Sequence, residues 1–469
     1  MSERSGVSAS ARGMDKVGNS AADRTADTWR QEPASLGQQR LWLLDQLVGP
    51  SATYNVPIAL RLDGKLDTEA LEGAITEIVR RHEVLRTTIG DVEGVPVQVI
   101  ARPEVIRLKV ADLSEIEADS RETECHRILV DEAEKPFRLG LESLFRPVLV
   151  KLGPDAHVLA LTMHHAITDG WSLGVFCREL ATLYAAFHAG RPSPLAELTA
   201  QYSDFVRWQR EWLTGDQLAD QLAYWRAQLR AMPEVLVLPT DRPRPPMQSF
   251  RGSLEVADLP TDLMDALRHL SREAGVTLFM TVLAAFQVLL HLYTGQTDIA
   301  VGSPIANRRR SEFEELIGYF VNNLVLRTDL SGNPTFRELL GRVREVALGA
   351  YGHQDLPFER IVEELRPQRT LAYSPIFQVM LMYRQDIQDV PALSDLGVTR
   401  IRVPRGTSKF DLTITLAREE DSMKVAAEYD VELFGAAAIR RTLGDLEAIM
   451  TRIVRAPDNH LKALIHHSG

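Results

Sequence analysis

Apolar residues recur at two different spacings along this chain, and the spacings predict alternating helices and strands. Helical spacing is found in four long segments, residues 36–47, 173–187, 261–274 and 277–293. Short continuous apolar runs, which are typical of buried strands, cover residues 56–62, 147–152 and 158–163. Asp67 stands where an N-cap would begin one more helix. Helices interleaved with buried strands predict an α/β fold.

The order of elements in the first half returns in the second half, after a break. A Trp-rich helical stretch at 202–225 is followed by five prolines within residues 232–246, which cannot form a helix and predict an extended connector. We expect a polar, disordered leader at 1–33, an N-terminal lobe at 34–205, a helical and Pro-rich connector at 206–250, and a C-terminal lobe at 251–469.

Composition narrows the class of protein. A chain of 469 residues is too long for one ordinary core, so two domains of roughly 200 residues each are expected. The net charge of −11, with interspersed acidic and basic residues, argues against nucleic acid or an anionic membrane as partner. Two cysteines suit a reducing cytoplasm. The absence of an 18-residue apolar run argues against a membrane span.

The segment HHAITDG at 164–170 concentrates the side chains that could carry chemistry. It follows an apolar strand and precedes a helix, so an imidazole is placed where a substrate can reach it. Such an imidazole accepts or holds the proton of an attacking amine or alcohol. Asp169 is well placed to anchor the turn, and Gly170 lets the backbone approach a reacting carbonyl. A purely structural pair of histidines stays open, as does a metal site, which would need further ligands.

Six segments resemble, in order, the motifs of condensation domains of nonribosomal peptide synthetases. MHHAITDGWS at 163–172 matches the third motif, which carries the family's active site, and HQDLPFE at 353–359 matches the sixth. The others are SLGQQRLWLL at 35–44, RHEVLRT at 81–87, YSDFVRW at 202–208 and IGYFVNNLVLR at 317–327. The seventh segment, RTLAYSP at 369–375, departs from the family's Arg-Asp-x-Ser-Arg-Asn-Pro, and Asn323 stands where Thr is more common.

The resemblance implies an α/β fold of two chloramphenicol-acetyltransferase-like lobes in a V-shaped pseudo-dimer, with a tunnel between them. It implies an acyltransferase of nonribosomal peptide or related antibiotic biosynthesis, which joins a carrier-tethered acyl or aminoacyl thioester to an amine or alcohol. The 4′-phosphopantetheine arm would belong to a partner, a peptidyl carrier protein, and the chain itself would bind no cofactor and no metal. The first three motifs are similar to those of members that accept an L-configured donor.

The resemblance also suggests roles for individual residues. His165 would handle the nucleophile, and Gly170 would point its N–H at the thioester oxygen. His164 would bond to neighbouring backbone, and Asp169 would pair with either Arg81 or Arg86. Residues 302–308 and 374–384 are the expected crossings between the lobes.

Two other functions share this resemblance. A coenzyme A-dependent acyltransferase would have the same fold, but the Asp-Phe-Gly-Trp-Gly signature of its plant-type members is absent. A noncatalytic module that docks carrier proteins is disfavoured by the intact histidine pair. Since neither end resembles a cut linker, a free-standing enzyme that acts on a small-molecule nucleophile is favoured slightly over an excised domain.

Overall fold

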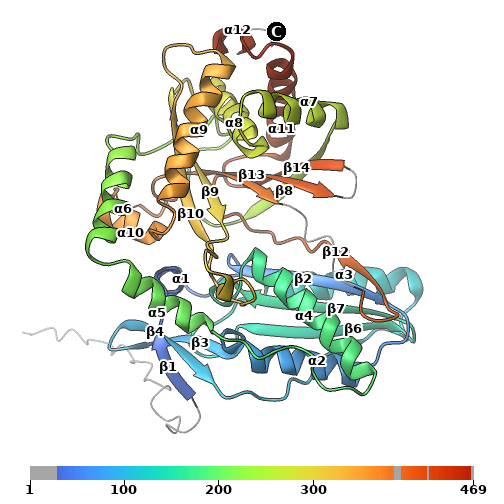
Figure 1. Ribbon diagram of the computed structural model, residues 1–469. Coiled ribbons are helices and arrows are strands. Elements are labelled where there is room, and N and C mark those ends of the chain that lie inside the picture. Colours follow the sequence, from blue (N-terminus) through green and yellow to red (C-terminus); the bar gives the residue numbers. More distant parts are fainter. Residues whose placement is uncertain (1–28, 369, 385–391, 420–421, 466–469) are drawn as a thin grey trace, which may run out of the picture.

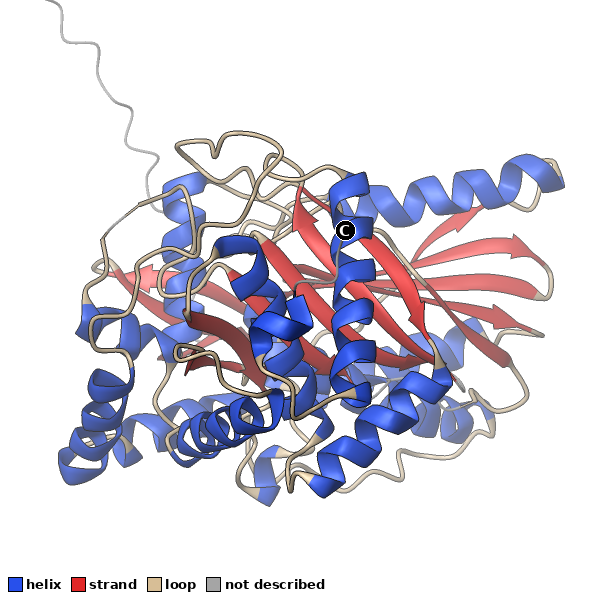
Figure 2. Cartoon of the chain, turned by 90° about the horizontal axis from the view of Figure 1, so that it is seen from above, coloured by secondary structure: helices blue, strands red, loops and turns tan. Residues whose placement is uncertain are grey.

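The chain folds into two lobes that lie one above the other in Figure 1. The computed structural model describes residues 29–368, 370–384, 392–419 and 422–465. Each lobe is built on its own β-sheet, and Figure 2 shows long helices lying over the strands. The expectation of an α/β fold is therefore met in both halves of the chain.

The N-terminal lobe holds a five-stranded sheet with the order β12-β2-β7-β6-β5. Its central strands are apolar on both faces because helices cover both: α2 and α4 pack in one hydrophobic cluster, and α3 packs in the other. Strand β7 pairs antiparallel with both of its neighbours. The strands are β2 (Asn55–Asp63), β5 (Lys109–Asp112), β6 (Phe145–Gly153), β7 (Ala156–His164) and β12 (Gly397–Ile401).

Side-chain caps fix where several of the first helices begin. Ser35 accepts a hydrogen bond from the backbone N–H of Gln38, and Asp67 accepts one from Ala70, as predicted from its position. Asp169 caps α4 in the same way through Ser172. The helices of this part of the chain are α1 (Leu36–Val48), α2 (Thr68–Arg81), α3 (Ala118–Glu134), α4 (Gly170–His188), α5 (Tyr202–Trp212) and α6 (Gly215–Gln228).

A small sheet of order β1-β4-β3 corrects the extent of the leader. Residues 29–33 were expected to be disordered, but they form strand β1 (Trp29–Pro33), antiparallel to β4 (Val95–Ala101). An edge strand of five mixed residues draws its stability from pairing with a distant strand, which local polarity does not reveal. β4 also pairs antiparallel with β3 (Thr87–Val92), and residues 83–86 just before β3 form a short 3₁₀ helix. Residues 1–28 lie outside the described part.

The C-terminal lobe holds a six-stranded sheet with the order β10-β9-β11-β13-β14-β8 and one large apolar core. Strand β11 pairs parallel with both neighbours, and the other pairs are antiparallel. The strands are β8 (Gly252–Leu259), β9 (Asp298–Ile305), β10 (Asn322–Asp329), β11 (Val379–Arg384), β13 (Leu412–Glu419) and β14 (Ser422–Asp430). The helices are α7 (Thr261–Glu273), α8 (Leu278–Thr294), α9 (Phe336–Gly352), α10 (Phe358–Leu365), α11 (Ala436–Arg455) and α12 (Leu461–Ile465).

Two segments of the second half cross into the N-terminal lobe. The first crossing is the segment between β9 and β10, residues 306–321. Its Arg308 is buried against Asp169, and its Phe313 and Phe320 belong to the N-terminal core. The expectation that residues 302–308 lead into a crossing is confirmed. The second expectation is wrong, since residues 379–384 form β11 inside the C-terminal sheet. The second crossing is instead β12, which pairs with β2.

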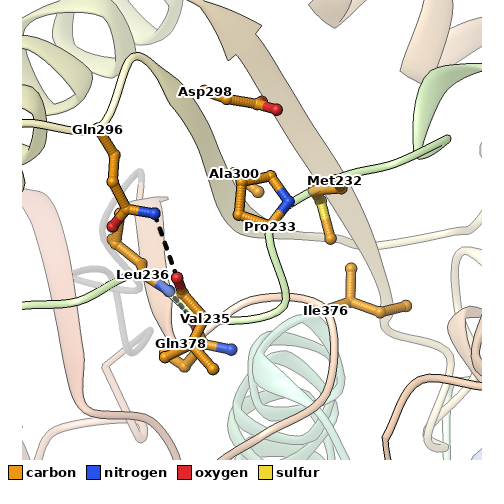
Figure 3. A pocket seen from close by; sticks show the side chains of 9 residues that line it. All are labelled: Met232, Pro233, Val235, Leu236, Gln296, Asp298, Ala300, Ile376 and Gln378. Carbon is orange, nitrogen blue, oxygen red and sulfur yellow. Dashed lines mark hydrogen bonds between the residues drawn. The ribbon is translucent and has the colours of Figure 1, made fainter.

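The Pro-rich connector is held on the C-terminal lobe by side-chain amides, as Figure 3 shows. Gln378 accepts from the backbone of Leu236 at 2.8 Å, and Gln296 accepts from Val237 at 2.8 Å and donates to the carbonyl of Val235. The cavity beneath them measures about 10 Å³, enough for one water molecule at most. These bonds satisfy backbone groups that the prolines prevent from joining a helix or a sheet.

No single helix in the described residues is long and apolar enough to cross a membrane, and one sharply bent pair, α7 with α8, passes by length and composition only.

Candidate active site

The histidine segment lies where β7 ends, at the side of the N-terminal lobe that receives the first crossing. His164 is the last residue of β7, and His165–Ile167 form a short 3₁₀ helix. Asp169 then caps α4, whose first residue is Gly170. The apolar strand and the cap fix both ends of the turn, which holds the imidazole of His165 in one place.

His164 is a buried structural residue. Its Nδ1 accepts a hydrogen bond from the backbone N–H of Ala166 at 3.1 Å, so the expected bond to neighbouring backbone is confirmed. The rings of Tyr54 and Phe137 lie about 6 Å from its ring. Burial, followed by the positive charges of Lys409 and Arg146, lowers the pKa of His164 to about 3. The ring therefore stays neutral and supports the turn.

His165 is held by its backbone, whereas its ring keeps a free nitrogen. The backbone N–H donates to the carbonyl of Tyr54 at 2.8 Å, and the ring packs edge-on against Tyr319 at 4.9 Å between centroids. Among the described residues, no group bonds to the Nδ1 atom of His165. Burial, and then the charge of Lys409, hold the pKa of His165 well below its usual value of 6.5. A neutral imidazole of this kind can accept a proton at neutral pH.

Asp169 pairs with Arg308, so the expected pairing with Arg81 or Arg86 is wrong. The guanidinium of Arg308 donates to both carboxylate oxygens at 3.0 and 3.1 Å, and both side chains are almost fully buried. The same carboxylate accepts from the hydroxyl of Ser172 and from the backbone N–H of Phe320. Arg308 is distant in sequence, and no local pattern distinguishes it from other arginines. The pair fastens the histidine turn to the first crossing.

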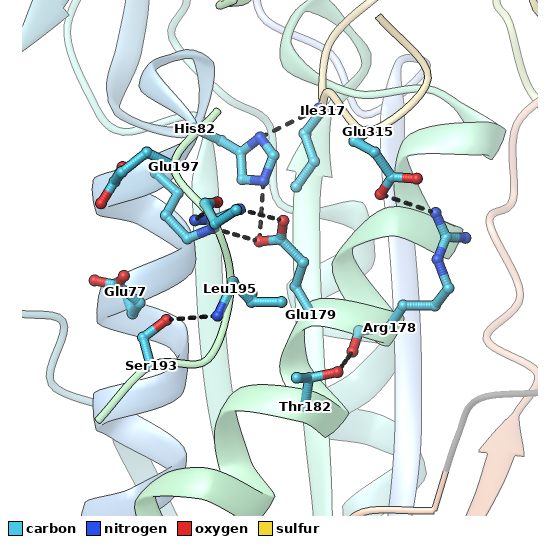
Figure 4. A network of polar contacts seen from close by, with 12 residues as sticks. Glu77, His82, Arg178, Glu179, Thr182, Ser193, Leu195, Glu197, Glu315 and Ile317 are labelled. Carbon is cyan, nitrogen blue, oxygen red and sulfur yellow. Dashed lines mark hydrogen bonds and ion pairs between the residues drawn. The ribbon is translucent and has the colours of Figure 1, made fainter. Parts of the chain in front are cut away.

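Arg81 takes part in a different buried network, whose members His82, Glu179 and Ile317 are labelled in Figure 4. Its guanidinium donates to both oxygens of Glu179, on α4. His82 accepts from the backbone N–H of Ile317 through Nδ1, so Nε2 carries the hydrogen that bonds to Glu179 at 3.1 Å. This network also fastens the first crossing to the N-terminal lobe, in addition to the Asp169 pair.

Arg86 lies outside the site as well. It donates to the carbonyl of Ala101 at 2.6 Å, on β4, and lies 3.7 Å from Glu83. It therefore supports the small sheet and not the histidine turn.

Gly170 is exposed at the start of α4, and a side chain built there would meet nothing within 4 Å. The first backbone N–H groups of a helix have no intrahelical partner and carry a partial positive charge. The open space beside Gly170 is therefore suited to an oxygen that gains negative charge.

The C-terminal lobe contributes charged side chains that the sequence analysis did not single out. The ammonium of Lys409 lies 4.9 Å from the ring centre of Tyr54, the residue whose carbonyl holds His165. Burial, and then the charge of Arg405, lower the pKa of Lys409 to about 8. Lys409 has no carboxylate within 4 Å among the described residues, although Glu428 is close enough to raise its pKa. Tyr319, whose ring packs against His165, is the one of these neighbours that the sequence could have indicated, because it lies in the segment that resembles the fifth family motif.

A metal at this turn is disfavoured by the use already made of Asp169. Its two oxygens accept five hydrogen bonds from protein groups, and none of these comes from His165. The described residues contain no group of three or more His, Cys, Asp or Glu side chains arranged to hold a metal.

Curated proteins with similar sequences are peptide synthetases. One of the subunits of linear gramicidin synthase from Brevibacillus parabrevis is 47% identical over 434 residues, which cover 92% of this chain and 8% of that protein. Chondramide synthase cmdD of Chondromyces crocatus is 44% identical over 91% of this chain and 11% of its own length. The chain thus spans only a small part of the length of these relatives.

Solved structures share the whole fold. The X-domain from teicoplanin biosynthesis matches with a TM-score of 0.85 and 29% identity, over 92% of this chain and 96% of that one. The SgcC5 protein from Streptomyces globisporus matches with a TM-score of 0.76 and 29% identity, over 91% of this chain and all of that one. The first condensation domain of the CDA synthetase matches at 0.73 and 21%, over 92% and 98%, and confirms the two-lobed acetyltransferase-like fold.

The family model for the condensation domain matches residues 30–467. With the histidine turn, the crossings and these relatives in agreement, the chain belongs to the condensation domain family.

Proposed function

We propose that this chain joins an acyl or aminoacyl group, held as a thioester on the 4′-phosphopantetheine arm of a peptidyl carrier protein, to an amine or alcohol. The observation that carries the proposal is His165, whose ring nitrogen is unbonded and whose pKa is depressed by burial and by Lys409. The product is an amide or an ester of nonribosomal peptide biosynthesis. The two cysteines, both free and buried, suit a cytoplasmic location.

The reaction needs no covalent intermediate with the protein. The nucleophile attacks the thioester carbonyl, the new C–N or C–O bond forms, and the C–S bond breaks. His165 takes the proton that the nucleophile loses, and this proton ends on the departing thiolate. Positioning and oxyanion stabilisation supply the rest, because a thioester is already activated. In this proposal the N–H of Gly170 faces the oxyanion, and Asp169 with Arg308 holds the turn without contacting substrate.

A thioester-turnover assay tests the proposal directly. The full chain is mixed with an amine or alcohol and with the same acyl donor loaded on a carrier protein or on coenzyme A. Faster turnover of the carrier-bound donor supports the proposal. Preference for coenzyme A indicates the acetyltransferase alternative, and carrier binding without turnover indicates a docking module, a use suggested by the solved complex of the teicoplanin X-domain with OxyB.

The same assay decides what the acceptor is. The match to SgcC5 covers all of that protein, which was solved in complex with a small diol. We propose that this chain likewise accepts a soluble amine or alcohol. Product that forms only when the acceptor is itself carrier-bound would contradict this and would indicate an ordinary synthetase domain.

Replacing Lys409 with Met should shift the pH dependence of this activity. The positive charge of Lys409 disfavours protonated His165, so its removal raises the pKa of His165. Because the reaction requires the neutral ring, the acid limb of the kcat/KM profile moves to higher pH, on the order of one unit. Lys409→Arg keeps the charge and should leave the limb in place. Identical profiles for the Met and Arg variants would remove Lys409 from this role.

A further inference from the structure

The second crossing carries arginines that the active site does not use. Arg400, Arg402 and Arg405 follow one another on β12 and the segment after it, and all three are exposed. Within the described residues none of them lies within 4.0 Å of a carboxylate. Glu428 is close enough to Arg405 to raise its pKa, so Arg400 and Arg402 are the two members of this group without a described carboxylate partner. Adjacent exposed cations of this kind attract an anion.

The packing of their neighbours shows which way these side chains face. Ile401 and Val403 pack against the hydrophobic cluster on the α3 face of the sheet, and Val398 packs against the cluster on the opposite face. Since side chains alternate along an extended segment, Arg400 and Arg402 face the α4 side. Arg400 indeed lies close enough to Cys177, on α4, to oppose the burial that raises the pKa of that thiol to about 11.

The strand register gives the distance from Arg400 to the histidine turn. Arg400 pairs with Leu60, which pairs with Leu159, five residues before His164 on β7. Five residues of strand and two strand spacings place the Cα atoms of Arg400 and His164 about 20 Å apart. A phosphopantetheine arm separates its phosphate from its thioester by roughly 20 Å when extended.

Arg405 lies closer to the turn than Arg400 does. It acts on the pKa of both His165 and Lys409, whereas Arg400 acts on that of Arg405. Positively charged side chains therefore follow the second crossing from Arg400, about one phosphopantetheine length from the histidine turn, to Arg405 near His165.

We propose that Arg400 and Arg402 bind the phosphodiester of a phosphopantetheine arm and so set its thioester beside His165. This inference rests on the proposed function and names the subsite that holds the arm. A guanidinium is the side chain best matched to two phosphate oxygens, because its N–H groups form a planar fork. The arm then runs along the crossing toward the N-terminus of α4.

Small thioesters that differ only in the phosphate test this subsite without a carrier protein. The full chain is given acyl-phosphopantetheine or acyl-pantetheine as donor and, separately, aminoacyl-phosphopantetheine or aminoacyl-pantetheine as acceptor. In one of these roles the phosphate should raise kcat/KM by about 10–100-fold, the value of charged hydrogen bonds. The Arg400→Gln, Arg402→Gln double variant should lose that advantage and turn over the pantetheine compounds as the wild type does.

A second double variant that removes the same number of positive charges elsewhere is the matched control. Arg268→Gln with Arg455→Gln removes a partly exposed cation from α7 and an exposed one from α11 of the C-terminal lobe, and should keep the phosphate advantage. An equal phosphate advantage in the Arg400, Arg402 variant, in both roles, would overturn the inference. So would a loss confined to whole carrier proteins, which would assign the arginines to the carrier's surface. Absence of turnover with every donor in the wild type would instead contradict the proposed function.

Discussion

We expect His165→Ala to lower product formation by roughly 10²–10⁴-fold, the usual contribution of a positioned proton-transfer group. The variant should fold as the wild type does. The ring of His165 makes one aromatic contact, with Tyr319, and its Nδ1 has no partner in the described residues, so truncation leaves no buried polar group without its bond. The measurement is single-turnover transfer from a loaded carrier protein, with circular dichroism and melting temperature as checks on the fold.

His269→Ala provides the matched control. That imidazole is exposed on α7 and lies beside Glu273, so its loss should change neither turnover nor stability. A folded His165→Ala protein with near wild-type turnover would show that the ring only packs. Loss of activity together with loss of structure would leave the two roles mixed, and His165→Asn, which keeps a polar side chain of similar length, would then separate them.

Local sequence was sufficient to predict most helices and the strands that are apolar on both faces. The apolar run before His164 and the cap residues Ser35 and Asp67 each report on their own neighbourhood, and the structure agrees with all of them. Two of the strands that were missed are of another kind. β8 and β12 are edge strands with mixed, half-exposed sequences, and their place is set by the register with distant partners.

The candidate site divides in the same way. The motif MHHAITDGWS was sufficient to locate the turn, because chemistry and backbone geometry are concentrated in ten consecutive residues. Arg308 and Lys409 reach that turn from the other lobe, across long stretches of sequence. Arg81 and Arg86 were predicted as partners of Asp169 because they lie in another family motif. In the structure Arg81 pairs with Glu179, and Asp169 pairs with Arg308 of the first crossing.

We expect Asp169→Ala to lower the free energy of unfolding by roughly 3–5 kcal/mol, as for other buried ion pairs that lose one partner. The substitution would leave the guanidinium of Arg308 buried, with 1% of its side chain exposed, and without its carboxylate. It would also remove the acceptors of Ser172 and Phe320, so the cap of α4 and the first crossing would loosen together. Activity should fall as a consequence. Denaturant unfolding, followed beside turnover, measures both effects.

A double-mutant cycle with Arg308→Met distinguishes a structural Asp169 from a catalytic one. If the carboxylate acts by holding the crossing, Arg308→Met alone should lose stability and turnover in parallel, and Asp169→Ala should cost less when Arg308 is already Met, because no buried charge is then left unpaired. If Asp169→Ala instead unfolds like the wild type and is inactive, the carboxylate acts on the substrate and the structural assignment is wrong. The full burial of both side chains and the bidentate geometry favour the first result.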